Sequence, residues 1–222
     1  MQHRVLCPPA QWMDAISPID SEEECAPLLP YLKGDVLEMF CRSGRLGEFL
    51  TSEGIAWSGM DPDAHLLEYA FLRGMFSVSC GIQPPTNSYD TIFGAFGTLS
   101  CISPHELDSF VCSVFAGLRT RGCALFELWY ESQNEEIAPF MDTYDGVEKL
   151  VRACVPQIKE DKVCFTMEWM IAQPNRTPFY QEYREERFLH SSTELCSLFG
   201  TYFSDVSIAE LGQRRWIIAC KS

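Results

Sequence analysis

The chain has 222 residues, and its hydrophobic (46%) and charged (22%) fractions are those of a folded globular protein and exclude a disordered one. Its formal net charge of −14 disfavours nucleic acid and anionic membrane surfaces as partners, because clustered Lys and Arg bind both. A small-molecule partner suits this composition better. We expect one domain over residues 1–222, either a monomer or a homodimer, with no membrane span, since no apolar run is long enough.

Eleven cysteines raise the alternatives of a disulfide scaffold or a metal site. No two of them have CxxC spacing, the histidines are far apart, and the first residues lack the apolar run of a secretion signal. Several cysteines fall inside apolar runs, where a thiol behaves as a small hydrophobe: Cys41, Cys80, Cys123, Cys164 and Cys220. We therefore expect no metal site, and buried, reduced thiols in a cytoplasmic protein.

The first half of the chain alternates apolar runs with helical patterns. Residues 1–33 are rich in proline and acidic side chains and are expected to form a leader or lid. The apolar runs predict strands at 35–40, 56–60, 75–80, 89–95 and 123–128. The helical patterns lie between them, at 43–50, 64–72 and 104–118. This alternation predicts an open parallel sheet with helices on both faces.

The pattern changes in the second half of the chain. Apolar and other side chains alternate at period two over 162–172, a turn follows at 173–178, and a second extended run covers 179–189. We expect a small antiparallel insertion within residues 131–190. A helix at 192–199 and closing strands at 206–210 and 214–220 complete the chain.

Candidate ligand-binding residues stand where the predicted parallel strands end, the edge at which open sheets bind their ligands. Glu38 lies in the run VLEMFCRSGRL at 36–46, with Gly44 before a helix, and Asp61 ends the second strand. A carboxylate there can accept two hydrogen bonds from a cis-diol. Together with YDTIFGAFGTL at 89–99, these segments resemble the ordered motifs of class I S-adenosylmethionine-dependent methyltransferases.

The resemblance implies a Rossmann-like, mostly parallel seven-stranded sheet, with S-adenosylmethionine as cofactor and S-adenosylhomocysteine as product. It assigns Asp61 to the ribose hydroxyls and Phe96 to the adenine or the substrate. The cofactor-binding residues that it implies are Glu38, Phe40, Arg42, Gly44, Asp61, Pro62, Ser79, Cys80 and Phe96.

Later segments narrow the resemblance. FELW at 126–129, FTMEWMIA at 165–172 and RFL at 187–189 look like the amino-sugar N,N-dimethyltransferases, in which an antiparallel layer caps the substrate pocket. The insertion at 131–190 would be that cap. Trp12 would replace a tyrosine motif, Cys101 a pocket histidine, and Glu127 or Glu168 would hold a cationic amine. The implied substrate-binding residues are Trp12, Cys101, Glu127, Trp129 and Glu168.

The chain departs from the family at the glycine motif. Phe40 and Arg42 replace its first two glycines, and Ser79 or Cys80 stands where an acidic residue faces the adenine. Large side chains could crowd the methionine moiety, or Arg42 could pair with its carboxylate.

Each candidate residue also has a plainer interpretation. Glu38 could favour the following helix through its dipole, Asp61 could be a turn residue, and Phe96 could belong to the core. Four aromatic residues could either belong to the core or line one side of the substrate pocket: Trp129, Tyr130, Trp169 and Tyr183.

Two hypotheses follow. In the first, the protein transfers the methyl group of S-adenosylmethionine to nitrogen or oxygen of a small molecule, mainly by aligning donor and acceptor. In the second, it is a methyltransferase-like protein that has lost methylation and binds a ligand or a partner subunit. His65, His105 and His190 have no partners at useful spacing, so the catalytic residues are left unassigned.

Overall fold

A computed structural model describes residues 10–129, 137–159 and 161–222. The chain forms two compact units. The first contains Asp20–Ser132 and Phe188–Ser222, and the second contains Met1–Ile19 and Gln133–Arg187. Each unit is built around its own sheet.

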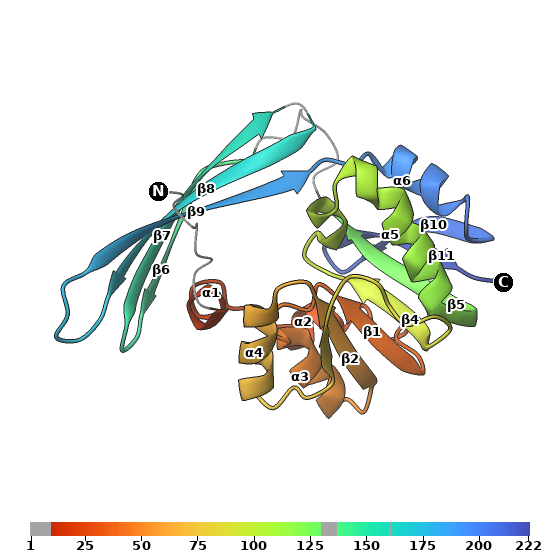
Figure 1. The fold of residues 1–222 in the computed structure, drawn as a ribbon, viewed down its shortest axis with the longest axis horizontal. Coiled ribbons are helices and arrows are strands. Elements are labelled where there is room, and N and C mark those ends of the chain that lie inside the picture. The colour runs from red at the N-terminus through yellow and green to blue at the C-terminus, as the bar shows by residue number, and fades with distance from the viewer. Residues whose placement is uncertain (1–9, 130–136, 160) are drawn as a thin grey trace. The chain divides into compact units, whose positions relative to one another are not determined.

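The first unit holds a seven-stranded sheet with the order β10-β11-β5-β4-β1-β2-β3 (Figure 1). Its strands are β1 (Asp35–Met39), β2 (Ala56–Asp61), β3 (Val78–Cys80), β4 (Tyr89–Gly94), β5 (Leu118–Leu128), β10 (Asp205–Leu211) and β11 (Arg214–Cys220). Strand β11 runs in the opposite direction to the other strands of this sheet. The structure confirms the predicted mostly parallel sheet.

Helices cover both faces of this sheet. They are α2 (Ser21–Cys25), α3 (Arg45–Ser52), α4 (Ala64–Leu72), η1 (Thr98–Cys101), α5 (Pro104–Gly117) and α6 (Ser192–Phe199). Successive side chains of β1 point to opposite faces of the sheet. Leu37 lies on the face that packs on α5 and α6. Glu38 lies on the other face, where Trp57 packs against Gly47 of α3. The helices begin at local signals, such as the capping box between Ser191 and Glu194.

The second unit holds a four-stranded antiparallel sheet with the order β6-β7-β8-β9 (Figure 1). Its strands are β6 (Phe140–Asp145), β7 (Lys149–Lys159), β8 (Lys162–Ala172) and β9 (Phe179–Phe188). The sequence predicted β8 and β9 but missed β6 and β7. Arg152 interrupts the alternation of apolar and polar residues by which β7 could have been recognised. It is a charged residue on the buried face and is only 9% exposed.

Helix α1 (Ala10–Ile16) packs on this second sheet. The Trp12 indole N–H donates to Glu148, and the Arg152 guanidinium donates to the Ser17 hydroxyl at 2.7 Å. Trp169 is fully buried in the same core, so its indole is core rather than part of an exposed aromatic wall. Helix α2 belongs to the first unit, which divides the predicted leader between the two units.

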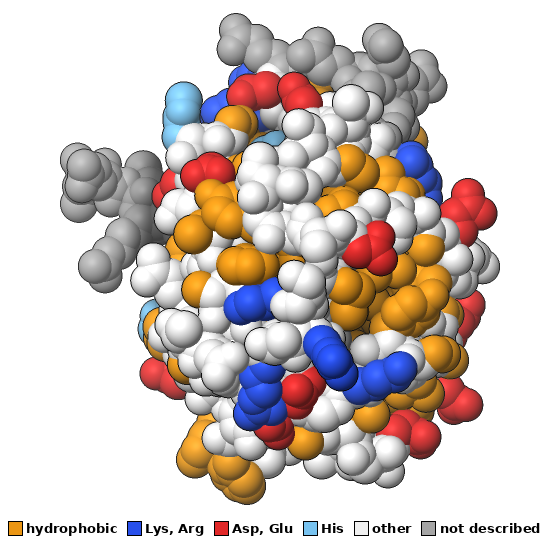
Figure 2. Space-filling model, turned by 90° about the vertical axis from the view of Figure 1, so that its right-hand side faces the viewer, with side chains coloured by type: hydrophobic (Ala, Val, Ile, Leu, Met, Phe, Trp, Pro, Cys, Tyr) orange, Lys and Arg blue, Asp and Glu red, His pale blue; other side chains and the backbone are white. Residues whose placement is uncertain are grey.

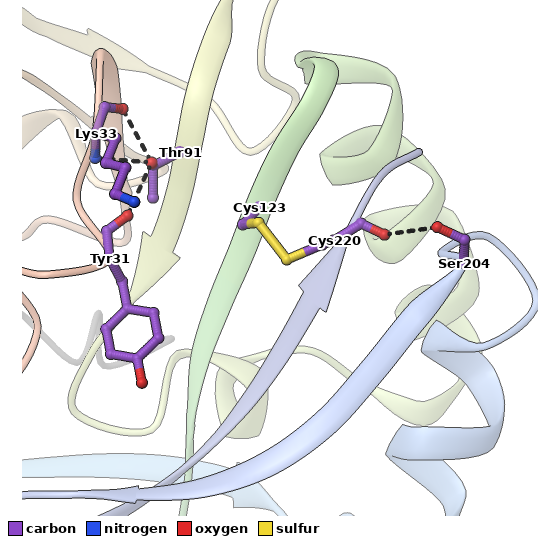
Figure 3. Close-up of a disulfide and its surroundings, with 6 residues drawn as sticks. All are labelled: Tyr31, Lys33, Thr91, Cys123, Ser204 and Cys220. Atoms are coloured by element: carbon purple, nitrogen blue, oxygen red, sulfur yellow. Dashed lines mark hydrogen bonds between the residues drawn. A yellow bond between two sulfur atoms is a disulfide. The ribbon is translucent and has the colours of Figure 1, made fainter.

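Cysteine chemistry differs from the sequence-based expectation at one pair. Cys123 and Cys220 are directly opposite on β5 and β11, with Cα atoms 4.2 Å apart, and they form a disulfide (Figure 3). The expectation of reduced thiols is therefore wrong for this pair, because a separation of 97 residues conceals their pairing in the sequence. Cys41 is buried as expected, whereas Cys80 is exposed.

The surface agrees with the charge composition. On the face seen in Figure 2, Lys and Arg side chains lie near Asp and Glu and do not form a continuous basic surface. The Arg119 guanidinium bonds both Asp35, at 2.7 Å, and Asp90, at 2.6 Å. Across the described residues, no helix combines the length and the apolar character that crossing a membrane requires.

The disulfide predicts a redox-dependent stability. Replacing Cys123 and Cys220 together by alanine should lower the free energy of unfolding by about 2–4 kcal/mol under oxidising conditions, because the cross-link constrains the unfolded chain. Urea unfolding followed by tryptophan fluorescence measures the difference. The same comparison in excess dithiothreitol is the control, and it should show a much smaller difference. An equal difference in both conditions would contradict a disulfide here.

Candidate functional site

The candidate site lies at the carboxyl edge of the seven-stranded sheet, where β1 and β4 are neighbours. From β1 the chain moves outward through β2 and β3, and from β4 it moves in the other direction to β5. Such a change of direction is where open parallel sheets bind ligands. The parallel register of Glu38 with Gly59 and with Phe93 brings the loops after β1, β2 and β4 together at this edge.

The loop after β1 has the backbone of a glycine loop in which the first two glycines are replaced. Phe40, Arg42 and Gly44 all have positive φ, at 55°, 53° and 71°. This left-handed region costs a residue with a Cβ about 1–2 kcal/mol. The Phe40 ring leaves the loop toward α5, where it meets Phe110 edge-on with ring centroids 6.4 Å apart. The fold therefore keeps Phe40 and Arg42 in a backbone conformation that is unfavourable for residues with a Cβ.

Asp61 holds this loop in place. One carboxylate oxygen accepts the Arg42 amide at 2.8 Å, and the other accepts the Asp63 amide at 2.8 Å. Burial raises the pKa of Asp61, while these two hydrogen bonds and the Arg42 charge act in the opposite direction. Each oxygen still has a second lone pair, so the carboxylate can accept further hydrogen bonds from a ligand.

Glu38 lies under the loop, on the face of the sheet that α3 covers. Its carboxylate accepts the Trp57 indole N–H at 3.0 Å, and only 3% of the residue is exposed. Burial raises the pKa of Glu38 to about 8, although the Trp57 hydrogen bond and the Arg45 charge oppose the shift. This hydrogen bond orients Trp57. Its ring packs so close to Gly47 and Gly59 that a side chain at either position would collide with it.

The loop after β4 is fixed by a network of charges. The Phe96 amide donates to Glu127, which also accepts Arg214 at 2.7 Å, and Arg214 reaches Glu24 of α2 at 2.6 Å. The Arg214 guanidinium lies 5.0 Å from the centroid of the Phe96 ring. Both oxygens of Glu127, predicted to hold an amine, thus have partners within the protein.

Two cavities lie within the first unit. A cavity of about 190 Å³ lies between the loop after β3 and helix α5 and is lined by Ile82, Gln83, Ile102, Glu106, Ser109, Phe110 and Ser113. A smaller pocket beside the ends of β5 and η1 is lined by Leu99, Ser100, Glu127, Leu128, Trp129, Phe188, His190 and Leu195.

The remaining candidates of the first unit lie at or near the same edge. Pro62, Ser79 and Cys80 are exposed where β2 and β3 end, and the Cys80 thiol lies 3.6 Å from the Pro62 carbonyl. The Cys101 thiol contacts the Gly97 carbonyl at 3.9 Å.

Two predicted substrate residues belong to the second unit. Trp12 is buried in its core, with its ring centroid 5.8 Å from that of Phe179, and Glu168 is exposed on β8. Tyr130 lies outside the described residues.

His190 and Ser100 line the smaller pocket and were not predicted. They come from segments far apart in the chain, so no local spacing could have indicated them. His, Cys, Asp and Glu side chains of the described residues form no group of three that could hold a metal ion.

The comparisons agree with this geometry at the level of the fold. Neither a protein-family profile nor a curated protein sequence matches the chain. Among solved structures, Streptomyces venezuelae DesVI is similar at a TM-score of 0.81 and 15% identity, covering 96% of this chain and 94% of DesVI. CalS10, a SAM-bound amino pentose methyltransferase from Micromonospora echinaspora, is similar over 100% of both chains at a TM-score of 0.80 and 12% identity.

A sugar N-methyltransferase from Streptoalloteichus, KedS8, is similar at a TM-score of 0.81 and 12% identity, covering 95% of this chain and 91% of its own. The chain therefore has the fold of S-adenosylmethionine-dependent methyltransferases. The resemblance seen in the sequence motifs is confirmed at that level.

The left-handed backbone at position 42 predicts an unusual order of stability. Arg42→Gly should be more stable than Arg42→Ala by about 1 kcal/mol, because both remove the side chain and only alanine retains a Cβ in the left-handed region. Urea unfolding of the two variants measures the difference. An alanine variant as stable as the glycine variant would contradict the conformation described for this loop.

Burial of Glu38 predicts a pH dependence of stability. Because its folded pKa of about 8 lies above the usual value of 4.5, the folded state holds a proton that the unfolded state releases. Glu38 therefore lowers stability as pH rises across that window. Between pH 5 and pH 8, the free energy of unfolding of the wild type should fall with rising pH more steeply than that of Glu38→Gln. The difference in slope should be up to about 1.4 kcal/mol per pH unit. Glu68→Gln, at an exposed carboxylate, is the control and should leave the slope unchanged. Equal slopes for wild type and Glu38→Gln would contradict the assignment.

Proposed function

We propose that this protein transfers the methyl group of S-adenosylmethionine to nitrogen or oxygen of a small-molecule acceptor, with S-adenosylhomocysteine as the product. The observation that carries the proposal is the loop after β1, which keeps a left-handed backbone at Phe40 and Arg42 and is hydrogen-bonded to Asp61 at the carboxyl edge. A purely structural turn has no need of this conformation at residues for which it is costly.

The proposed cofactor site uses residues that the first unit brings to this edge. Asp61 would accept the ribose hydroxyls with its second lone pairs, and Pro62 and Cys80 would border the adenine. The cavity beside Ile82 and α5 adds volume next to the loop after β3. The guanidinium of Arg42 would pair with the carboxylate of the methionine moiety. When bound, the cofactor supplies an electrophilic methyl group.

Alignment of donor and acceptor is the protein's main contribution to this chemistry. A sulfonium methyl group already reacts with a neutral amine, so holding donor and acceptor in line and excluding water supply most of the rate. An amine on a small molecule is the acceptor that the structural similarity favours, because CalS10 is named as an amino pentose methyltransferase and KedS8 as a sugar N-methyltransferase. Trp129 lines the smaller pocket and would contact the acceptor.

Other acceptor contacts rest on the sequence resemblance. Trp12 and Glu168 lie in the second unit, whose antiparallel sheet we assign as a substrate cap by that resemblance. Cys101 would border the acceptor from η1. For Glu127, the bonds to Phe96 and Arg214 support a role in fixing the loop after β4.

Loss of methylation is the alternative, and the geometry does not favour it. A protein released from cofactor binding would have no reason to keep the strained loop, the buried Asp61 carboxylate and their mutual hydrogen bond together. The Phe40 ring is packed against Phe110 of α5. Arg42 contributes a positive charge near Asp61.

Calorimetric titration with S-adenosylhomocysteine tests the proposal. We expect micromolar binding by the wild type and at least about 100-fold weaker binding by Asp61→Ala, since the variant loses charge-assisted hydrogen bonds to the ribose and the anchor of the loop. Asp35→Ala is the matched control, because Asp35 lies at the opposite end of β1, and it should bind like the wild type. Circular dichroism establishes that the variants are folded. An Asp61→Ala protein that binds as tightly as the wild type would place the site elsewhere.

A further inference from the structure

We propose that His190 is the general base of the reaction, taking the proton from the attacking nitrogen or oxygen of the acceptor through Nδ1. The inference rests on the proposed function and names a catalytic group for it. His190 lies in the short connection between β9 and α6, and it is only 9% exposed.

The pocket around His190 is built from three other parts of the first unit. Ser100 comes from η1, Glu127 and Trp129 from the end of β5, and Leu195 from α6. The pocket has a volume of about 10 Å³, room for one water-sized group. It therefore has room for a single amine or hydroxyl group. Trp129 also adjoins Gly97, which links the pocket to the loop after β4.

One hydrogen bond fixes which nitrogen of His190 can accept a proton. Nε2 lies 2.9 Å from the Ile102 carbonyl oxygen, which can only accept, so Nε2 carries the hydrogen. The neutral ring then has its lone pair on Nδ1. Phe188, stacked on the imidazole with ring centroids 6.5 Å apart, holds the ring orientation. A buried histidine with a fixed tautomer is a preorganised proton acceptor.

Two acidic side chains, Glu194 and Glu127, lie near His190. The carboxylate of Glu194, in the first turn of α6, interacts with His190, and its own pKa is held below the usual range mainly by the Ser191 hydroxyl. Glu127 faces the same pocket, but Arg214 compensates its charge. An imidazolium formed during the reaction would thus have Glu194 as its counter-charge.

The step balances as a simple transfer. A lone pair on the acceptor nitrogen or oxygen forms the new bond to the methyl carbon, and the carbon–sulfur bond breaks with its electron pair left on sulfur. The acceptor proton moves to His190 Nδ1. The products are the methylated acceptor, S-adenosylhomocysteine and an imidazolium, which returns its proton to water.

The tautomer can be measured directly by nitrogen NMR on histidine-labelled protein saturated with S-adenosylhomocysteine. The His190 signal is assigned by its loss in His190→Gln. We expect an Nε2–H tautomer at pH 8, with Nδ1 unprotonated. An Nδ1–H tautomer in a complex that binds S-adenosylhomocysteine would overturn the role of His190 and leave the proposed function intact. Failure to bind S-adenosylhomocysteine would instead remove the proposed function and this inference with it.

Kinetics test the chemical role with glucosamine as the acceptor probe and radiolabelled S-adenosylmethionine. His190→Gln keeps a donor for the Ile102 carbonyl but has no basic nitrogen, so we expect kcat to fall about 10²- to 10⁴-fold with an unchanged KM for the donor. The acidic limb of the pH profile should disappear. His65→Gln, whose side chain is 90% exposed, is the control. An unchanged kcat and pH profile in His190→Gln would overturn the proposal, and the NMR experiment decides the tautomer even if glucosamine is not turned over.

Discussion

The hydrogen bond from the Arg42 amide to the Asp61 carboxylate is the contact on which the site depends. It joins the loop after β1 to the end of β2, and it holds Arg42 in a left-handed conformation that a residue with a Cβ avoids. Glycine would adopt this backbone without strain, whereas here the surrounding contacts must stabilise it. The second oxygen of Asp61 anchors the Asp63 amide, so one buried carboxylate sets the path of two loops. That single side chain therefore fixes the carboxyl edge at the ends of β1 and β2.

A second constraint is the burial of acidic groups around the same edge. Glu38 is buried beside Trp57, and Glu127 is buried between the Phe96 amide and Arg214. A buried carboxylate is costly unless hydrogen bonds or an opposite charge compensate it. Glu38 therefore joins β1 to β2, and Glu127 ties the loop after β4 to the sheet. The same residue types that suggest ligand contacts in the sequence act first as the supports of the loops.

Much of the fold could be predicted from local patterns, and the failures share a physical cause. The strands of the parallel sheet are short apolar runs buried on both faces, and they were recognisable as such. Strand β7 was missed because Arg152, which is bonded to Asp142 and Ser17, occupies an inward position that the alternation should leave apolar. For the candidate site, Asp61 and the loop after β1 were predictable because ordered motifs mark them. The Cys123–Cys220 disulfide and His190 were not, since their partners are distant in the sequence and meet only in the folded chain.

A crystal structure of the protein soaked with S-adenosylhomocysteine tests the proposed cofactor site most directly. We expect the ligand at the carboxyl edge, with its ribose hydroxyls hydrogen-bonded to Asp61. The backbone at Phe40 and Arg42 should remain left-handed. A ligand bound elsewhere, or a loop that has to change its backbone conformation to admit the ligand, would contradict the claim that this loop is a preformed cofactor site.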